Sequence, residues 1–324
     1  MKSYSVGADK DYHTVNEALQ AVRFSEESVI TVDEGSYREK LFFEKEDLTI
    51  TGQGPEKTLI INGDGAKDIL SDGSRRGTFR SYTVFLSGKR ITLKDLSIIN
   101  DAGPGRTVGQ SVSVYSDAET VYMENVFIDS HQDTLFMAPL PAGVRQPGGF
   151  FGPRHLGERT LTRQYYKNCR ISGDIDFIFG GADALFEDCE IIVKNRGEEI
   201  NGYIAAPCES DGEFGIVFKD CMISAEEGTE AGSVFLGRPW RPKARTVYLN
   251  CSFDESINNR RFSGWGSDPI DPDKTRFAEY GSKDKEGRAL DLSLRDAGVR
   301  ILDEREANIL LQKLEGLKED IKCR

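Results

Sequence analysis

Residues 173–191 read GDIDFIFGGADALFEDCEI, and this stretch decides how the rest of the chain is interpreted. The alternation of apolar and polar residues that starts at Ile175 stops at the run Phe177–Phe179, so the stretch does not match a strand with one solvated face. A short apolar run closed by two glycines is typical of a parallel strand packed on both faces. Asp174 and Asp176 adjoin this strand, and a carboxylate in such a place is costly to bury unless another group pairs with it.

One pattern, x-[Asp/Asn]-x-x-[Ile/Phe], recurs along the chain. It occurs as KDLSI (94–98), ENVFI (124–128), KNCRI (167–171), EDCEI (187–191), KDCMI (219–223) and LNCSF (249–253). The Asp or Asn stands at positions 95, 125, 168, 188, 220 and 250, which makes steps of 30, 43, 20, 32 and 30 residues. Such a repeat, with short apolar strands and Asx or glycine turns, predicts a solenoid of parallel strands. Helical repeats would need longer amphipathic stretches, which the middle of the chain lacks.

Four of the six cysteines fall on one position of this repeat, namely Cys169, Cys189, Cys221 and Cys251. Stacked coils would place them above one another as small buried side chains beside a ladder of Asx turns. We therefore expect free thiols in a core column rather than disulfide bonds.

The two ends of the chain differ from the repeat, as the open ends of a solenoid require. Thr14 and Glu17 form a capping box that begins an amphipathic helix, which we expect to cover the first coil. Residues 303–322 carry leucines at helical spacing and predict a second helix packed on the outside. The 43-residue step contains an excursion at about 137–165, rich in Pro, Gly and Arg, which we expect on the surface. No linker divides the chain, so we expect one domain over residues 1–324.

Composition limits the possible partners and the location. The chain has 54 acidic residues against 42 Lys and Arg, and the formal net charge of −12 disfavours nucleic acid and anionic membranes as partners. No apolar run approaches the roughly 20 residues that a membrane span needs. The first residues hold no apolar signal core, so we expect a cytoplasmic protein, or a secreted one if a leader was removed.

Five polar side chains stand beside strands of different coils. They are Gln110, Gln132, Asp133, Asp176 and Arg238. Gln110 and Gln132 are 22 residues apart, about one coil, and Asp133 and Asp176 are about one coil apart once the excursion is set aside. The 62 residues from Asp176 to Arg238 correspond to three coils of about 21. Because stacked strands lie about 4.8 Å apart, all five can line one face. Each alone is better explained as an exposed polar residue on a strand, but that explanation does not account for all five in phase.

The segments around these residues resemble the signature segments of pectin methylesterases. They are GQSVSVY (109–115), HQDTLF (131–136), GDIDFIFG (173–180) and LGRPW (236–240), with further matches at GSYREKL, TITGQG, GTFRSYTV, GYIAAP and RFAEYGSKDKEG. The resemblance extends from near Tyr12 to about Gly287 and implies an all-β fold, a right-handed parallel β-helix, in agreement with the repeat. Pro207 stands where the family commonly has glutamine, and the excursion at 137–165 is longer than usual.

The resemblance implies roles in the hydrolysis of galacturonate methyl esters. Asp176 matches the nucleophile that forms an acyl-enzyme, and Asp133 matches the general acid that protonates methanol and then acts as base. Gln132 and Gln110 match the amides that stabilise the oxyanion, and Arg238 matches the group that keeps Asp176 ionised. The residues that match the substrate groove are Tyr115, Phe136, Phe179 and Trp240. For Phe179 a plain core role is also open.

The chemistry of carboxylates agrees with these roles. Two carboxylates one coil apart do not easily both ionise, so one pKa rises and the other is held down. A guanidinium beside Asp176 selects it as the charged partner, which leaves Asp133 able to keep a proton. Side-chain amides aimed at a developing oxyanion typically supply about 3 kcal/mol each. The sequence has no Ser-His-Asp pattern and no zinc-ligand spacing, so we expect neither metal nor cofactor.

Two other functions are open at this stage. A pectate lyase or a polygalacturonase acts on the glycosidic bond, but a lyase needs acids clustered around Ca²⁺ and a glycosidase needs two carboxylates astride the bond. The amide next to Asp133 favours acyl transfer instead. The other candidate is a non-catalytic β-solenoid that only binds acidic polysaccharide. The favoured prediction is a monomeric, metal-independent esterase that acts on methyl-esterified homogalacturonan or oligogalacturonides.

Overall fold

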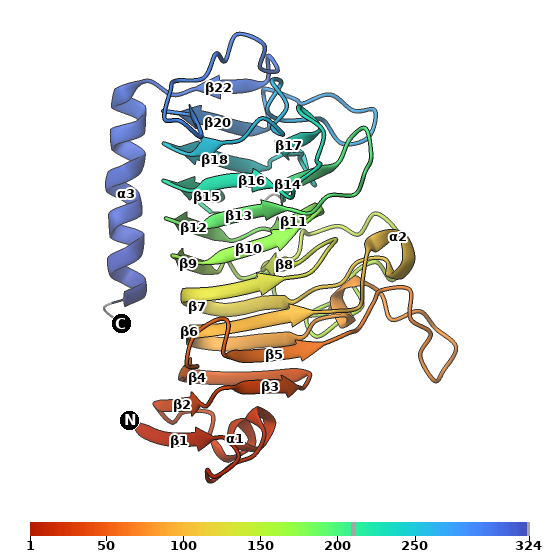
Figure 1. Cartoon of the computed structure of the whole chain (residues 1–324), viewed down its shortest axis with the longest axis vertical. Coiled ribbons are helices and arrows are strands. Elements are labelled where there is room, and N and C mark those ends of the chain that lie inside the picture. Colours follow the sequence, from red (N-terminus) through yellow and green to blue (C-terminus); the bar gives the residue numbers. More distant parts are fainter. Residues whose placement is uncertain (209–211, 323–324) are drawn as a thin grey trace.

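A parallel β-helix forms the body of the molecule. The computed structural model describes residues 1–208 and 212–322, and within them 22 strands join into one hydrogen-bonded sheet that winds upward coil by coil (Figure 1). The strands of successive coils pair in parallel from β1–β2 at one end to β20–β22 at the other. The solenoid of parallel strands predicted from the repeat is therefore confirmed.

The strands are short except where one continues around a corner of the coil. Their bounds are β1 Lys2–Val6, β2 Ser28–Val32, β3 Gly35–Arg38, β4 Leu41–Thr51, β5 Thr58–Asn62, β6 Val84–Asn100, β7 Val114–Asp129, β8 Leu135–Met137, β9 Arg163–Lys167, β10 Arg170–Gly173, β11 Ile175–Gly180, β12 Asp183–Glu187, β13 Glu190–Val193, β14 Gly202–Pro207, β15 Ile216–Lys219, β16 Met222–Ala225, β17 Val234–Gly237, β18 Arg245–Leu249, β19 Ser252–Phe253, β20 Arg276–Tyr280, β21 Lys283–Asp284 and β22 Val299–Ile301. The helices are α1 Val15–Ala21, α2 Gly105–Val108, α3 Glu304–Lys322 and a 3₁₀ turn, η1, at Thr78–Arg80.

The repeated Asx residues make the same corner in each coil. All six have a left-handed backbone, with φ between 50° and 54°: Asp95, Asn125, Asn168, Asp188, Asp220 and Asn250. Asp and Asn tolerate this conformation better than other residues that carry a Cβ, so they recur where the chain must turn. The strand register follows the same steps, because Phe127 of β7 pairs with Arg170 of β10, 43 residues on.

The interior of the coils is filled by columns of like side chains. Cys169, Cys189, Cys221 and Cys251 are buried free thiols, as predicted. A second column consists of stacked rings, with centroids 4.4 Å, 5.0 Å and 4.5 Å apart along Tyr166, Phe186, Phe218 and Tyr248. Each coil therefore stacks on the next through its side chains as well as through its backbone hydrogen bonds.

Helices cover the first coil and one side of the stack. Thr14 and Glu17 form the predicted capping box at the start of α1, which lies at the N-terminal end of the solenoid (Figure 1). Helix α3 runs back along the outside of the coils and buries Leu314 and Leu317 against a sheet face that includes Tyr165. The predicted outer helix is confirmed. In the described part of the chain, no helix is both long and apolar enough to cross a membrane.

The excursion between β8 and β9 runs as an irregular segment over residues 138–162. It lies on the surface, as predicted, since residues 142–148 are all exposed, but one of its aromatic side chains is buried. Phe150 of this segment is only 7% exposed and joins a cluster of buried side chains, mostly aromatic, outside the coils, which also includes Phe79 of η1. The excursion therefore forms part of the surroundings of β8 and β11, the strands that carry the predicted acids.

Candidate active site

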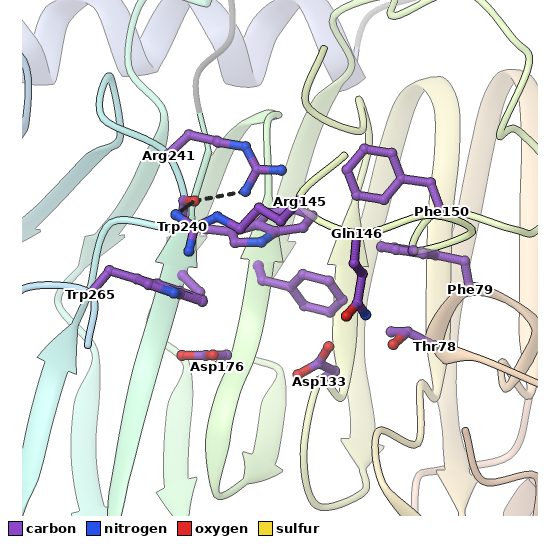
Figure 2. A pocket seen from close by; sticks show the side chains of 13 residues that line it. Thr78, Phe79, Asp133, Arg145, Gln146, Phe150, Asp176, Trp240, Arg241 and Trp265 are labelled. Atoms are coloured by element: carbon purple, nitrogen blue, oxygen red, sulfur yellow. Dashed lines mark hydrogen bonds between the residues drawn. The ribbon is translucent and has the colours of Figure 1, made fainter. Parts of the chain in front are cut away.

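A pocket of about 270 Å³ lies over the strands where the predicted polar residues gather. It is lined by Thr78, Phe79, Asp133, Arg145, Gln146, Gly149, Phe150, Asp176, Phe179, Ala206, Trp240, Arg241 and Trp265. Figure 2 shows Asp133 and Asp176 next to each other on one side of the pocket, with Arg145 and Arg241 on the opposite side. Two acids thus share a pocket in which five of the thirteen lining residues are aromatic.

Asp176 is placed by an irregularity in β11. The strand is buried, and the pairing of β11 with β14 shifts its register between Ile175 and Ile178. Asp176 itself has φ of 51°, so the chain turns there as it does at the Asx corners. Phe177 is fully buried in the core, whereas Asp176 lines the pocket and is 6% exposed. The break in alternation seen in the sequence is therefore the kink that presents the acid.

Asp133 occupies the equivalent corner one coil earlier, just before β8. Its φ is 64°, and its backbone N–H donates to the carbonyl oxygen of Ile175 at 3.0 Å. The backbone N–H of Asp174 in turn donates to the carbonyl oxygen of His131 at 3.0 Å. The two turns are thus stacked directly, and the prediction that Asp133 and Asp176 lie one coil apart is confirmed.

Arg238 follows β17 and reaches back to Asp176. Its Nε and Nη2 donate to the two carboxylate oxygens at 2.8 Å and 2.7 Å, and the guanidinium carbon lies 4.0 Å from the ring centroid of Tyr203 and 4.4 Å from that of Trp265. Two hydrogen bonds and two aromatic rings hold the guanidinium in one orientation.

The number of coils between Asp176 and Arg238 corrects the sequence analysis. Ile175 pairs with Tyr203 and Tyr203 pairs with Phe235, so the two residues are separated by two coils of 28 and 32 residues rather than three of about 21. The loops between strands differ in length, and the average length of a coil therefore does not give the count. Arg238 still meets Asp176 because its long side chain passes over the ring of Tyr203 on the middle coil.

The pocket raises the pKa of both acids, but unequally. Burial raises the pKa of Asp133 well above its ordinary value, and the negative charge of Asp176 adds to this rise. Burial also raises the pKa of Asp176, while the hydrogen bonds and charge of Arg238 oppose the change. The expectation that one pKa is held down is therefore wrong, because desolvation exceeds the effect of the guanidinium. The order of ionisation is nevertheless the predicted one: Asp176 loses its proton before Asp133.

The two glutamines lie on neighbouring coils before that of Asp176, and neither lines the pocket. The carbonyl oxygen of Gln132 accepts the backbone N–H of Ser111 at 2.9 Å, and its side chain lies against Gly105 of α2, where a Cβ would come within 2.8 Å of Oε1. Gln110 lines a neighbouring cavity of about 710 Å³, which shares Thr78 with the pocket. Gln132 thus adjoins Asp133, whereas Gln110 lies at the border of the pocket.

The predicted groove aromatics separate into two pairs. Phe179 and Trp240 line the pocket. Tyr115 and Phe136 do not: both are 0% exposed, and their place in the groove is corrected to a place beneath it. Tyr115, Phe136 and Phe179 form one column across β7, β8 and β11, and the ring of Phe79 covers the first two at centroid distances of 5.9 Å and 4.9 Å.

Most of the lining residues that sequence reasoning missed come from outside the repeat. These are Thr78 and Phe79 of η1, Arg145, Gln146, Gly149 and Phe150 of the excursion, and Arg241 and Trp265 beyond β17, whereas the missed Ala206 lies on strand β14 of the coils. The arginine-rich composition of the excursion was the available signal for Arg145, but no periodicity located it. Within residues 1–208 and 212–322, no three His, Cys, Asp or Glu side chains are grouped so that they would hold a metal ion.

The fold and the pocket together define the class of protein. It is a parallel β-helix whose pocket holds a carboxylate paired with arginine beside a carboxyl group of raised pKa. The chain belongs to the pectinesterase family, whose sequence model matches residues 5–141 and 159–310.

Three relatives illustrate the similarity. "Probable pectinesterase/pectinesterase inhibitor 64" of Arabidopsis thaliana is 32% identical over 282 residues, which cover 81% of this chain and 42% of that protein. The structure of pectin methylesterase from carrot is 26% identical, with a TM-score of 0.77 and 93% and 88% of the two chains covered. Pectin methylesterase PemA from Erwinia chrysanthemi is 25% identical, with a TM-score of 0.75 and 94% of each chain covered. The chain spans about two fifths of the length of several curated relatives.

Proposed function

We propose that this protein hydrolyses methyl esters of galacturonate residues in pectin or oligogalacturonides, releasing methanol and leaving the free acid. Family membership and similarity to pectin methylesterases support the substrate class. The observation that carries the proposal is the carboxylate of Asp176, held by two hydrogen bonds to Arg238 in the same pocket as Asp133, whose pKa is well above its ordinary value.

The first step forms an acyl-enzyme on Asp176. One carboxylate oxygen attacks the ester carbonyl carbon, and the carbonyl oxygen becomes a tetrahedral oxyanion. The side-chain amides of Gln132 and Gln110 donate to this oxyanion. Asp133 gives its proton to the methoxy oxygen as the carbon–oxygen bond breaks, so that methanol leaves and the sugar carboxyl remains joined to Asp176 as an anhydride.

The second step hydrolyses this anhydride. Asp133, now ionised, takes a proton from a water molecule that attacks the same carbonyl carbon. The bond to Asp176 breaks, and its carboxylate returns to Arg238 while the galacturonic acid is released. Asp133 ends protonated, as it began.

The aromatic walls make a weak nucleophile effective. Phe179, Trp240 and Phe150 line the pocket with apolar surface, which limits hydration of the Asp176 carboxylate. A carboxylate that is less hydrated and already oriented by Arg238 needs less reorganisation to attack. In the same surroundings, the hydrogen bonds from the amides act at a low local dielectric and are stronger than in water.

Methanol release from methyl-esterified oligogalacturonides tests the proposal. The same reactions are monitored for the absorbance of an unsaturated product, which a lyase would form, and for new reducing ends, which a polygalacturonase would form. Asp176→Asn is expected to remove turnover. Asp188→Asn is the matched control, because Asp188 has the same left-handed backbone, with φ of 52°, and lies outside the pocket. Absence of methanol from the wild type, or substantial turnover by Asp176→Asn, would refute the proposal.

A further inference from the structure

Part of the pocket wall comes from a segment that the family sequence does not define. The sequence model of the family matches up to residue 141 and again from residue 159, so residues 142–158 lie outside the match. This 142–158 segment nevertheless supplies Arg145, Gln146, Gly149 and Phe150 to the lining of the pocket. The 142–158 segment therefore adds polar and aromatic side chains to the pocket beside the predicted catalytic residues.

The 142–158 segment is attached to the site at two points. The ring of Phe150 packs against that of Phe79 at 5.7 Å and against that of Trp240 at 6.0 Å. Arg241, which is 9% exposed, donates from Nη2 to the carbonyl oxygen of Gly143 at 2.6 Å. One contact lies on each side of Arg145 in the chain, so the backbone that carries Arg145 is fixed to the pocket.

Arg145 presents a positive charge to the pocket. One of its nitrogens, Nη2, donates to the carbonyl oxygen of Trp240 at 2.9 Å, and its guanidinium carbon lies 4.7 Å from the ring centroid of Trp265. A guanidinium has five N–H donors, so most of them are left for a ligand. Among the residues that the structure describes, Arg145 has no carboxylate partner. Figure 2 shows it across the pocket from Asp176 and Asp133.

The other charged groups of the pocket do not neutralise the positive charge of Arg145. Arg238 is bound to Asp176, and the raised pKa of Asp133 favours its neutral form. Arg241, which also lines the pocket, adds a second positive charge, and its Nη1 and Nη2 donate to the carbonyl oxygens of Trp240 and Gly143. A second anion that enters the pocket therefore meets Arg145 and Arg241 rather than an unpaired carboxylate. In the proposed substrate, the available anion is the carboxylate of a galacturonate unit that carries no methyl ester.

We propose that Arg145 binds the free carboxylate of a de-esterified galacturonate unit next to the unit whose ester reacts. This makes Arg145 a specificity-determining residue and makes partly de-esterified chains better substrates than fully esterified ones. The inference rests on the proposed esterase function. A guanidinium suits this role because it donates two parallel hydrogen bonds to one carboxylate, which a lysine does not.

The test uses Arg145→Gln and Arg145→Lys, with Arg260→Gln as matched control. Arg260 is an exposed arginine paired with Asp296 at 2.8 Å, outside the pocket lining. Binding of fully de-esterified trigalacturonate is measured by calorimetry at several salt concentrations, which requires no turnover. In parallel, kcat/KM for methanol release is measured on fully and on partly esterified oligomers of equal length.

Arg145→Gln is expected to weaken trigalacturonate binding about tenfold at low salt and to flatten the dependence of the affinity on salt, because one exposed ion pair is lost. It should also lower the ratio of kcat/KM for partly over fully esterified substrate, mainly through KM, with Arg145→Lys intermediate and Arg260→Gln like the wild type. Equal trigalacturonate affinity in Arg145→Gln and wild type, or no detectable binding by the wild type, overturns the inference. Failure of the esterase proposal is seen separately, as absence of methanol from the wild type on every esterified substrate.

Discussion

Removal of the guanidinium of Arg238 is expected to move the pH dependence of activity in a defined direction. The two hydrogen bonds of 2.8 Å and 2.7 Å favour the ionised form of Asp176, and burial opposes it. In Arg238→Ala the effects of burial and of the negative charge of Asp174 are left, both of which raise the pKa of Asp176, so this pKa rises further. The acidic limb of kcat/KM, which reports ionisation of the nucleophile in the free enzyme, should therefore move to higher pH.

The size of the change follows from the geometry. Hydrogen bonds to charged groups contribute about 1.5–3 kcal/mol each, and both side chains are largely buried, at 18% and 9% exposure, so screening by solvent is limited. Water that enters the vacated space recovers part of this, which leaves about 3 kcal/mol. Since 1.36 kcal/mol corresponds to one pKa unit, the acidic limb should move up by about two pH units. Arg238→Lys keeps the charge but not the paired hydrogen bonds, and about half of that change is expected.

The assay is initial-rate methanol release between pH 4 and 9 for wild type, Arg238→Ala and Arg238→Lys. Removing one partner of a buried ion pair typically costs about 3–5 kcal/mol of stability, so the thermal midpoint of each variant is measured first and the rates are taken below it. The alkaline limb should move upward by less, because Arg238 is a weaker influence on Asp133 than burial or Asp176. An acidic limb that stays in place in both variants would show that Arg238 does not control ionisation of the nucleophile.

Three further predictions concern the acid, the amide and the outer helix. Asp133→Asn should lower kcat about 10²–10⁴-fold. Because burial raises the pKa of Asp133, the wild type loses stability as the pH rises from the unfolded pKa of 3.8 through the raised native pKa. Asp133→Asn should therefore melt at a higher temperature than the wild type at pH 7, and the difference should close towards pH 4. A difference in melting temperature that does not depend on pH would contradict this. Gln132→Ala should lower kcat about 10²–10³-fold with little change in KM, and a loss below fivefold would remove it from the oxyanion site. Leu314→Ala should cost about 2–5 kcal/mol of unfolding free energy in denaturant titration, since Leu314 is 1% exposed, while kcat of the folded protein at 25 °C should stay as in the wild type.

The fold could be predicted from the sequence because one backbone requirement is repeated. One corner recurs from coil to coil with a left-handed residue, and Asp95 and Asn125 are two of the six Asx residues that supply it. Wherever such a residue recurs with an apolar pair after it, a strand must follow in the same place. The number of residues between corners is set by loops, whose lengths do not affect the corner, and this is why the count of coils up to Arg238 was wrong.

The candidate site was predicted where it lies on the repeat and missed where it does not. Asp133 and Asp176 stand at coil corners, so the register that stacks one above the other could be predicted from the sequence. Tyr115 and Phe136 also stand on the repeat, and the pattern shows that they share a column with Phe179. It does not show that other chain segments cover part of this column, because Phe79 and the excursion come from stretches without periodicity.

Residues at the coil corners and residues that surround them also differ in their chemical roles. The left-handed corners of the coil already favour Asp and Asn, so a β-helix of this kind places short acids in stacked positions at little cost to its backbone. Two such acids become different from one another only through what surrounds them, namely Arg238 with its aromatic contacts at Asp176 and burial at Asp133. The coil corner thus explains why carboxylates lie there, while their surroundings explain which of them ionises first. The 142–158 segment adds Arg145, the residue proposed to select the neighbouring sugar. A search of related sequences for substrate preference should therefore compare the 142–158 segment rather than the strands, because the strands are constrained by the fold itself.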